Sequence, residues 1–180
     1  MQLRSCVLNC PYCYVTFAGI WGKPVWYTTN ELIDSFIKSK QDVFHLMGGS
    51  PAIYINYWDE ILNKIPQDKV FHSDLMLIEK RYDIEVLREL KKENAIYAVN
   101  IKGVTSEDFY LNTKRKFNEK LFWSNLYKVV KSEINFYITF TNPDKKLLDN
   151  FKCKLISLYG DKILDDSFII DIIQYKALSK

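Results

Sequence analysis

The chain has 180 residues, a length typical of one domain with a substantial hydrophobic core. Hydrophobic residues make up 48% of it and charged residues 26%, which excludes a disordered or collagen-like chain. The formal net charge is +3, and the densest basic stretch, Lys114 to Lys116, is short, so nucleic-acid binding is not indicated. We therefore expect a single domain over residues 1–180.

No apolar run approaches the roughly 18 to 20 residues that are needed to cross a bilayer. The first residues, Met1 to Cys6, leave no room for the apolar region of a signal peptide. The sequence thus predicts a cytoplasmic protein without a membrane partner. Three of the four cysteines lie within eight residues, far from Cys153, and such crowding indicates metal ligation rather than disulfide bonds.

Apolar strands alternate with amphipathic helical patterns, as in successive βα units. The predicted elements are, in chain order, a helix over 28–40, a strand over 43–47, a helix over 56–65, a strand over 70–74, a helix from residue 83, a strand over 95–101, a helical region over 105–131, a strand over 134–141, a helix over 144–159 and a strand over 168–173. The sequence therefore predicts five strands and five helices.

Local signals support these boundaries. Thr28 and Glu31 have the spacing of a capping box, and Asn56 and Asp83 are candidate N-caps. In the strand over 134–141, apolar and polar side chains alternate, so one face can pack on helices while the other lines a polar interior.

The cysteines stand in Cys6-Val-Leu-Asn-Cys10-Pro-Tyr-Cys13, a C-x3-C-x2-C spacing. Pro11 disfavours a regular helix here, so a tight loop is expected to bring three thiolates together. Iron–sulfur clusters are usually held by four cysteines. Three cysteines would leave one iron without a protein ligand, and that open position is where chemistry can occur.

This spacing, with the aromatic Tyr12 just before the third cysteine, resembles the hallmark of the radical S-adenosylmethionine (radical SAM) superfamily. The resemblance implies a [4Fe-4S] cluster on Cys6, Cys10 and Cys13, with Tyr12 among the cofactor-binding residues. It also implies that the open iron binds the amino and carboxylate groups of S-adenosylmethionine, and that the reduced cluster cleaves this molecule to a 5′-deoxyadenosyl radical. The resemblance names no further catalytic residue.

Two alternatives remain open. The three cysteines could form a structural zinc site with His45, His72 or Cys153 in a binding module, although zinc sites more often pair C-x2-C units. The chain could also be an inactive radical SAM remnant. Each histidine sits in an apolar strand, and for both we expect a buried side chain with its hydrogen bonds satisfied.

A second motif, Gly48-Gly49-Ser50-Pro51, directly follows the strand over 43–47. Paired glycines let backbone groups approach a ligand without interference from a Cβ atom. The segment resembles the Gly-Gly-Glu-Pro element with which the superfamily binds the methionine end of S-adenosylmethionine. Ser50 replaces the common glutamate, and its hydroxyl can accept a hydrogen bond from the ammonium group without the assistance of a charge.

Polar residues also follow the next two strands. Asn100-Ile101-Lys102-Gly103 resembles a Ser-Ile-Lys-Gly segment of archaeal-type members related to glycyl-radical-enzyme (pyruvate formate-lyase) activating enzymes. The resemblance implies that Asn100 contacts the ribose of S-adenosylmethionine and Lys102 its carboxylate. Ser73 and Asp74 are weaker candidates of the same kind, because Leu75 stands where that family often has glycine.

The resemblance implies an α/β fold, a partial (βα)6 TIM-like barrel with the cofactors at the carboxyl ends of its strands. Only five residues precede Cys6, so we expect the first strand to be absent or very short. The implied activity is that of an oxidoreductase that abstracts hydrogen from an unknown substrate, and the likeness to activating enzymes favours a protein substrate. The implied partner is a flavodoxin- or ferredoxin-like electron donor.

Overall fold

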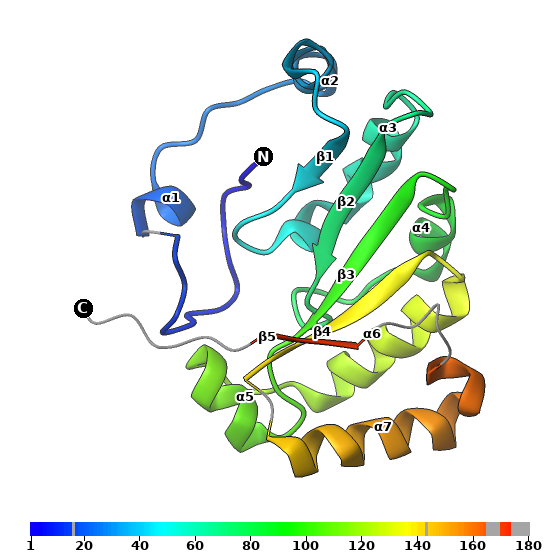
Figure 1. The fold of residues 1–180 in the computed structure, drawn as a ribbon. Coiled ribbons are helices and arrows are strands. Elements are labelled where there is room, and N and C mark those ends of the chain that lie inside the picture. The colour runs from blue at the N-terminus through cyan, green and yellow to red at the C-terminus, as the bar shows by residue number, and fades with distance from the viewer. Residues whose placement is uncertain (16, 143, 165–169, 174–180) are drawn as a thin grey trace.

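Five strands form one parallel sheet in this computed structural model, which describes residues 1–15, 17–142, 144–164 and 170–173 (Figure 1). The strands are β1 (Val43–Leu46), β2 (Val70–Leu75), β3 (Ala95–Ile101), β4 (Phe136–Thr141) and β5 (Ile170–Ile173). They lie in the order β1-β2-β3-β4-β5, so each strand pairs with the next along the chain. Parallel neighbours need crossover connections, which confirms the predicted α/β fold. Of the strand predicted over 168–173, residues 168 and 169 lie outside the described part.

The helices are α1 (Phe17–Trp21), α2 (Thr29–Ser39), α3 (Trp58–Leu62), α4 (Ile84–Glu89), α5 (Ser106–Thr113), α6 (Glu119–Ser132) and α7 (Lys145–Tyr159), with 3-10 helices η1 (Pro51–Tyr57) and η2 (Asp161–Leu164). The predicted caps Thr28 and Asp83 both accept hydrogen bonds from the first turns of their helices. No helix of the described residues is both long and apolar enough to cross a membrane.

The prediction for Asn56 was wrong. Helical structure begins earlier, in η1, whose first residue is Pro51, and Tyr57 rather than Asn56 precedes α3. Proline favours the first position of a helix because its fixed φ suits helical geometry and its missing N–H is not needed there. The turn therefore starts directly after the Gly-Gly-Ser segment, and Asn56 falls inside it.

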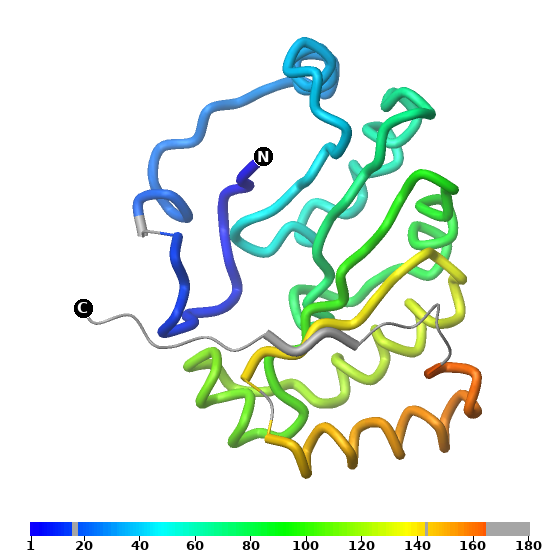
Figure 2. The backbone as a smooth tube through the Cα atoms, viewed as in Figure 1, coloured from blue at the N-terminus to red at the C-terminus, as the bar shows by residue number. Residues whose placement is uncertain are grey.

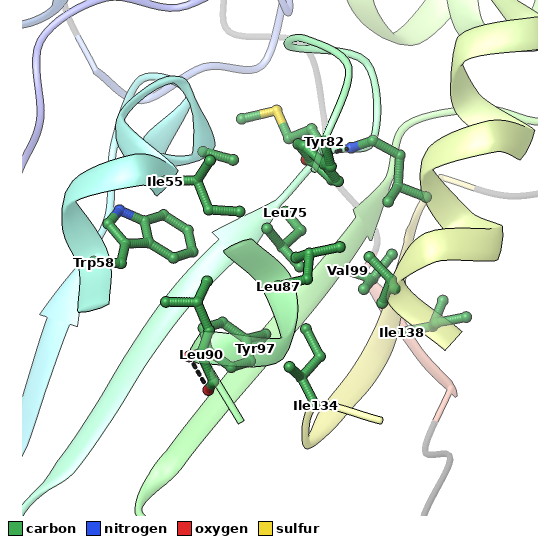
Figure 3. Close-up of a cluster of buried hydrophobic side chains, with 14 of the residues drawn as sticks. Ile55, Trp58, Leu75, Tyr82, Leu87, Leu90, Tyr97, Val99, Ile134 and Ile138 are labelled. Carbon is green, nitrogen blue, oxygen red and sulfur yellow. Dashed lines mark hydrogen bonds between the residues drawn. The ribbon is translucent and has the colours of Figure 1, made fainter. Parts of the chain in front are cut away.

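One face of the sheet packs against the helices and forms the hydrophobic core (Figure 3). Trp58 is fully buried, and its ring stacks on that of Tyr97 with centroids 6.0 Å apart. The hydroxyl of Tyr97 donates a hydrogen bond of 2.9 Å to the Leu90 carbonyl, so this polar atom is satisfied inside the core. Figure 1 shows α3, α4 and α6 on this side of the sheet, with the N-terminal segment and α1 on the other.

The opposite face of the sheet is polar. Because side chains alternate along a strand, His72 and Asp74 of β2 point away from the face that carries Phe71 and Leu75. The alternation predicted for β4 is also present: Ile138 is fully buried in the core cluster, whereas Tyr137 hydrogen-bonds to His72 across the polar face. This polar face is the interior of the partial barrel.

The first residues of the chain run beside the end of β1 (Figure 2). Gln2 forms a parallel bridge with Met47, and the Leu3 amide donates to the Met47 carbonyl over 2.8 Å. The Met47 amide in turn donates to the Met1 carbonyl, also over 2.8 Å. The first strand of the predicted barrel is therefore present as a very short pairing.

Candidate cofactor site

The cysteine loop lies at the carboxyl end of the sheet and is fixed by three kinds of contact. The Cys13 amide donates to the Cys10 carbonyl over 3.1 Å, which closes a turn between the second and third cysteines. The Asn9 amide donates over 3.0 Å to the carbonyl of Thr113, at the end of α5. Leu8 is buried in the hydrophobic core cluster. The loop is thus attached to the barrel between its cysteines.

The Gly-Gly-Ser segment after β1 holds the entry to this loop. Gly49 has a φ of +60°, and a Cβ atom on it would lie 2.1 Å from the Ser5 carbonyl oxygen. That close approach allows the Ser50 amide to donate to the same carbonyl over 2.8 Å. The space where a Cβ atom would stand holds the backbone of Ser5 beside Gly49 and the Gln2 side chain beside Gly48.

Ser50 contacts the cysteine loop directly. Its side chain is fully buried, its hydroxyl oxygen accepts a hydrogen bond of 3.1 Å from the Val7 amide, and its hydroxyl donates to the Cys6 sulfur over 3.4 Å. The hydroxyl therefore satisfies a backbone donor and orients a cysteine. The sequence motif identified Ser50 but did not show that its partner is Cys6.

A partly buried cation lies beside the cysteines. Lys102 follows β3, its ammonium donates to the Thr141 hydroxyl over 3.1 Å, and it lies 5.9 Å from the centre of the buried Tyr12 ring. Burial lowers the pKa of Lys102, and the nearby Cys10 and Asp74 partly oppose this effect. Burial likewise raises the pKa of the Cys10 thiol, against the field of Lys102. This ammonium is placed to neutralise negative charge at the cysteines.

Asn100 and Asp74 share the interior face with Lys102. The side-chain amide oxygen Oδ1 of Asn100 accepts a hydrogen bond from the Thr139 hydroxyl, and the Asn100 side chain also forms a hydrogen bond with the Asp74 carboxylate. Burial raises the pKa of Asp74, although His45, Asn100 and Lys102 oppose the shift. Thr139 and Thr141 were missed as individual candidates, and the period-two pattern of β4 was the signal that could have identified them.

Ser73 does not share this face. Because it alternates with Asp74 along β2, its side chain lies on the helix-facing side, is fully buried and donates a hydrogen bond of 3.0 Å to the Leu46 carbonyl. Ser73 thus joins β2 to β1, and the structure does not bring it to the predicted cofactor-binding residues.

The histidines differ from expectation. The His72 imidazole is paired with the Tyr137 hydroxyl at 2.9 Å, but the buried Nε2 atom of His45 has no hydrogen-bond partner among the described residues. The two rings contact each other edge to face, with centroids 4.3 Å apart. The expectation of a satisfied side chain was therefore wrong for His45.

The donor set of the cysteine loop fits a cluster with one open iron. Iron–sulfur clusters are held by cysteine thiolates, and each of three cysteines can bind a different iron. Within the described residues, the one group of three metal-ligand atoms that lie within 4.8 Å of one another is His45, His72 and Asp74, and it contains no cysteine.

Cys153 lies in α7, far from the other three cysteines in the sequence. Its side chain is exposed. The apolar residues around Cys153 in the helical pattern are typical of a thiol buried in the core. The helix instead buries Leu148, Phe151 and Leu155, and Cys153 falls outside that stripe. The donor set of three partly buried cysteines beside a partly buried ammonium fits an anionic, thiolate-bound cluster with one open iron.

Comparisons with known proteins bear on the family and the fold of this chain. The sequence model described as the radical SAM superfamily matches residues 3–143. No curated protein matches the chain. Among solved structures, SuiB of Streptococcus suis bound to S-adenosylmethionine is similar, with a TM-score of 0.67 and 10% identity over 99% of this chain and 41% of that one.

Two further structures share the fold. One is anSMEcpe with bound AdoMet, with a TM-score of 0.62 and 12% identity over 97% of this chain and 51% of that one. The other is methylornithine synthase (PylB), with a TM-score of 0.57 and 9% identity over 97% of this chain and 53% of that one. The chain thus spans between two fifths and about half of these proteins.

The family match extends over the cysteine loop, the Gly-Gly-Ser segment and the first four strands. It includes the residues whose geometry is described above. The chain belongs to the radical SAM superfamily, a family of enzymes whose cofactors are a [4Fe-4S] cluster and S-adenosylmethionine.

Proposed function

We propose that this chain is the catalytic core of a radical SAM enzyme that generates a 5′-deoxyadenosyl radical and uses it to abstract hydrogen from a protein or peptide. The observation that supports this most strongly is the cysteine loop, whose entry is hydrogen-bonded to Ser50 and whose cysteines lie beside the partly buried Lys102. When bound and reduced, the cluster supplies the electron that cleaves S-adenosylmethionine to methionine and the radical.

Each residue of the site has a role in this proposal. Cys6, Cys10 and Cys13 would hold three irons of the cluster, and the fourth iron would be free to bind the amino and carboxylate groups of S-adenosylmethionine. The Lys102 ammonium binds that carboxylate and offsets the charge of the thiolates, since it faces the cysteines from the end of β3. Tyr12 packs beside Lys102 and excludes water.

The barrel interior supplies the remaining contacts. Asn100 lies on the polar face between Asp74 and Thr139, where its amide can bond to ribose hydroxyls. Gly49 and Ser50 act from beneath the cysteine loop: they fix its entry, and through it the position of Cys6, whereas Gly48 lies against the flexible Gln2 side chain.

The substrate class follows from two lines of support. The Asn100 to Gly103 segment resembles that of glycyl-radical-enzyme activating enzymes, which act on a protein. The structural neighbour SuiB has been solved with its precursor peptide SuiA. A flavodoxin- or ferredoxin-like electron donor completes the proposal, and the reducing cytoplasm is the compartment that suits the free thiols.

The test is anaerobic reconstitution of the full chain with iron and sulfide, followed by reduction and addition of S-adenosylmethionine. We expect about four irons per chain, by the composition of a [4Fe-4S] cluster, and release of 5′-deoxyadenosine with methionine. The Cys10→Ser variant should give neither, while Cys153→Ser, a matched change at an exposed thiol, should behave as the wild type. A colourless wild-type protein that binds zinc through its cysteines would contradict the proposal.

A further inference from the structure

A second group of metal-ligand side chains lies inside the barrel, separate from the cysteines. His45 on β1 and His72 on β2 are direct neighbours in the register of the sheet, and Asp74 is two residues further along β2 on the same face. One ligand atom from each of these three side chains lies within 4.8 Å of the other two. All three residues are partly exposed, so an ion can reach them.

We propose that His45, His72 and Asp74 bind one divalent first-row transition-metal ion, for which Zn²⁺ is the simplest probe. Two imidazoles and one carboxylate form a donor set that such ions prefer, and three protein ligands leave a coordination position open. In a tetrahedral site with bonds of about 2.0 to 2.1 Å, ligand atoms are about 3.3 Å apart. Movements of at most about 1.5 Å by the ligand atoms, which small side-chain rotations can supply, would therefore bring all three onto one ion.

Two features of the group point to a ligand. The buried Nε2 atom of His45 has no hydrogen-bond partner in the described part of the chain, and such unpaired buried atoms are rare in folded proteins. The ring of His72 is held by the Tyr137 hydroxyl at 2.9 Å, and Asp74 is held by the side chain of Asn100. Outer contacts of this kind orient the ligands of metal sites.

The surrounding charges set the expected strength of binding. Burial lowers the pKa of His45 and lowers that of His72 to about 4, which keeps both imidazoles in the neutral form that metals bind. Two cationic groups face the cluster and oppose an added cation: the Met1 ammonium acts on His45, and Lys102 acts on Asp74. We therefore expect reversible binding that is weaker than at a structural zinc site.

The open position has a consequence for the barrel interior. Asp74 bonds to Asn100, and Lys102 is charge-coupled both to Asp74 and to the cysteines, so the metal group and the cysteine site share one polar face. A bound ion could take an oxygen of a water or substrate molecule as its fourth ligand. The inference does not depend on the proposed function, because none of the three ligands is a cysteine.

The experiment uses the full chain after anaerobic cluster reconstitution and removal of excess iron, so that the cysteines are occupied. Zn²⁺ is titrated in competition with a chromophoric chelator. We expect one ion per chain, with an affinity reduced at least tenfold in His72→Ala and in the nearly isosteric Asp74→Asn. Asp108→Asn is the matched control, because burial also raises the pKa of Asp108 but this residue does not belong to the metal-ligand group. The Asp108→Asn variant should bind Zn²⁺ with unchanged affinity.

A second measurement separates this site from the cysteines. A variant with Cys6, Cys10 and Cys13 all changed to serine should still bind one Zn²⁺ with the wild-type affinity, and Zn²⁺ should raise its thermal midpoint. Loss of zinc in this variant, or wild-type affinity in both His72→Ala and Asp74→Asn, would overturn the inference. If the serine variant binds zinc but the reconstituted wild type does not cleave S-adenosylmethionine, only the proposed function fails.

Discussion

Gly49→Ala tests whether the segment after β1 positions the cysteine loop. The added Cβ would lie 2.1 Å from the Ser5 carbonyl oxygen and 3.1 Å from that of Leu3, both backbone atoms. Placing alanine at a φ of +60° costs roughly 1–2 kcal/mol. Displacing Ser5 would also break the hydrogen bond from the Ser50 amide to the Ser5 carbonyl and leave a buried donor unpaired, which costs about 1–3 kcal/mol. We expect a total loss of roughly 2–5 kcal/mol in unfolding free energy.

Gly48→Ala is the matched control for this change. Gly48 has a similar φ of +75°, but its added Cβ would meet the Gln2 Cγ, an atom of a flexible side chain that can move. Its cost should therefore stay near the backbone term of roughly 1–2 kcal/mol. In a domain of this size, the two variants should lower the thermal midpoint by roughly 4–20 °C and 2–8 °C, respectively.

The assay is thermal unfolding of both variants, together with iron content after anaerobic reconstitution. Gly49→Ala should lose iron in parallel with stability, because the displaced Ser5 adjoins Cys6, whereas Gly48→Ala should keep most of its iron. Equal midpoints and equal iron contents in the two variants would refute the argument that Gly49 sets the position of the loop.

Three further predictions follow from single contacts. Ser50→Ala should lower the unfolding free energy by about 1–3 kcal/mol, because the Val7 amide loses its acceptor, and unchanged denaturant midpoints would contradict this. Lys102→Gln should weaken S-adenosylmethionine binding about 10- to 100-fold in a titration of the reconstituted protein, as expected for a lost charge-assisted hydrogen bond; equal affinity would exclude the proposed carboxylate contact. Burial raises the pKa of Glu79, so the folded state retains this proton to higher pH than the unfolded state does. The unfolding free energy of the wild type, compared with that of the Glu79→Gln variant, should therefore fall as pH rises above 4.5. A rise over this pH range would contradict a raised pKa of Glu79.

The sequence predicted those parts of the molecule that depend on local patterns. The capping residue Thr28, the cysteine spacing and the alternation along β4 act over a few residues, and all are present in the structure. The location of the polar interior could be inferred in the same way, because alternation along a strand assigns each side chain to a face.

Other features depend on which segments meet in space. The contact between Ser50 and Cys6 joins residues 44 positions apart, and nothing in the Gly-Gly-Ser-Pro pattern specifies it. The pairing of His45 with His72 follows from the register of β1 on β2, which the apolar content of the two strands leaves undetermined. Strand alternation predicts that the side chains of Ser73 and Asp74 lie on opposite sides of the sheet. Which of these side chains points into the barrel depends on which side of the sheet the helices cover.

The most direct test of the account is electron paramagnetic resonance spectroscopy of the anaerobically reconstituted and reduced full chain, with and without S-adenosylmethionine. If Cys6, Cys10 and Cys13 hold a [4Fe-4S] cluster with one open iron, the reduced signal should change when S-adenosylmethionine completes the coordination of that iron. A cluster signal that stays the same at saturating S-adenosylmethionine, or the absence of any cluster signal, would contradict it.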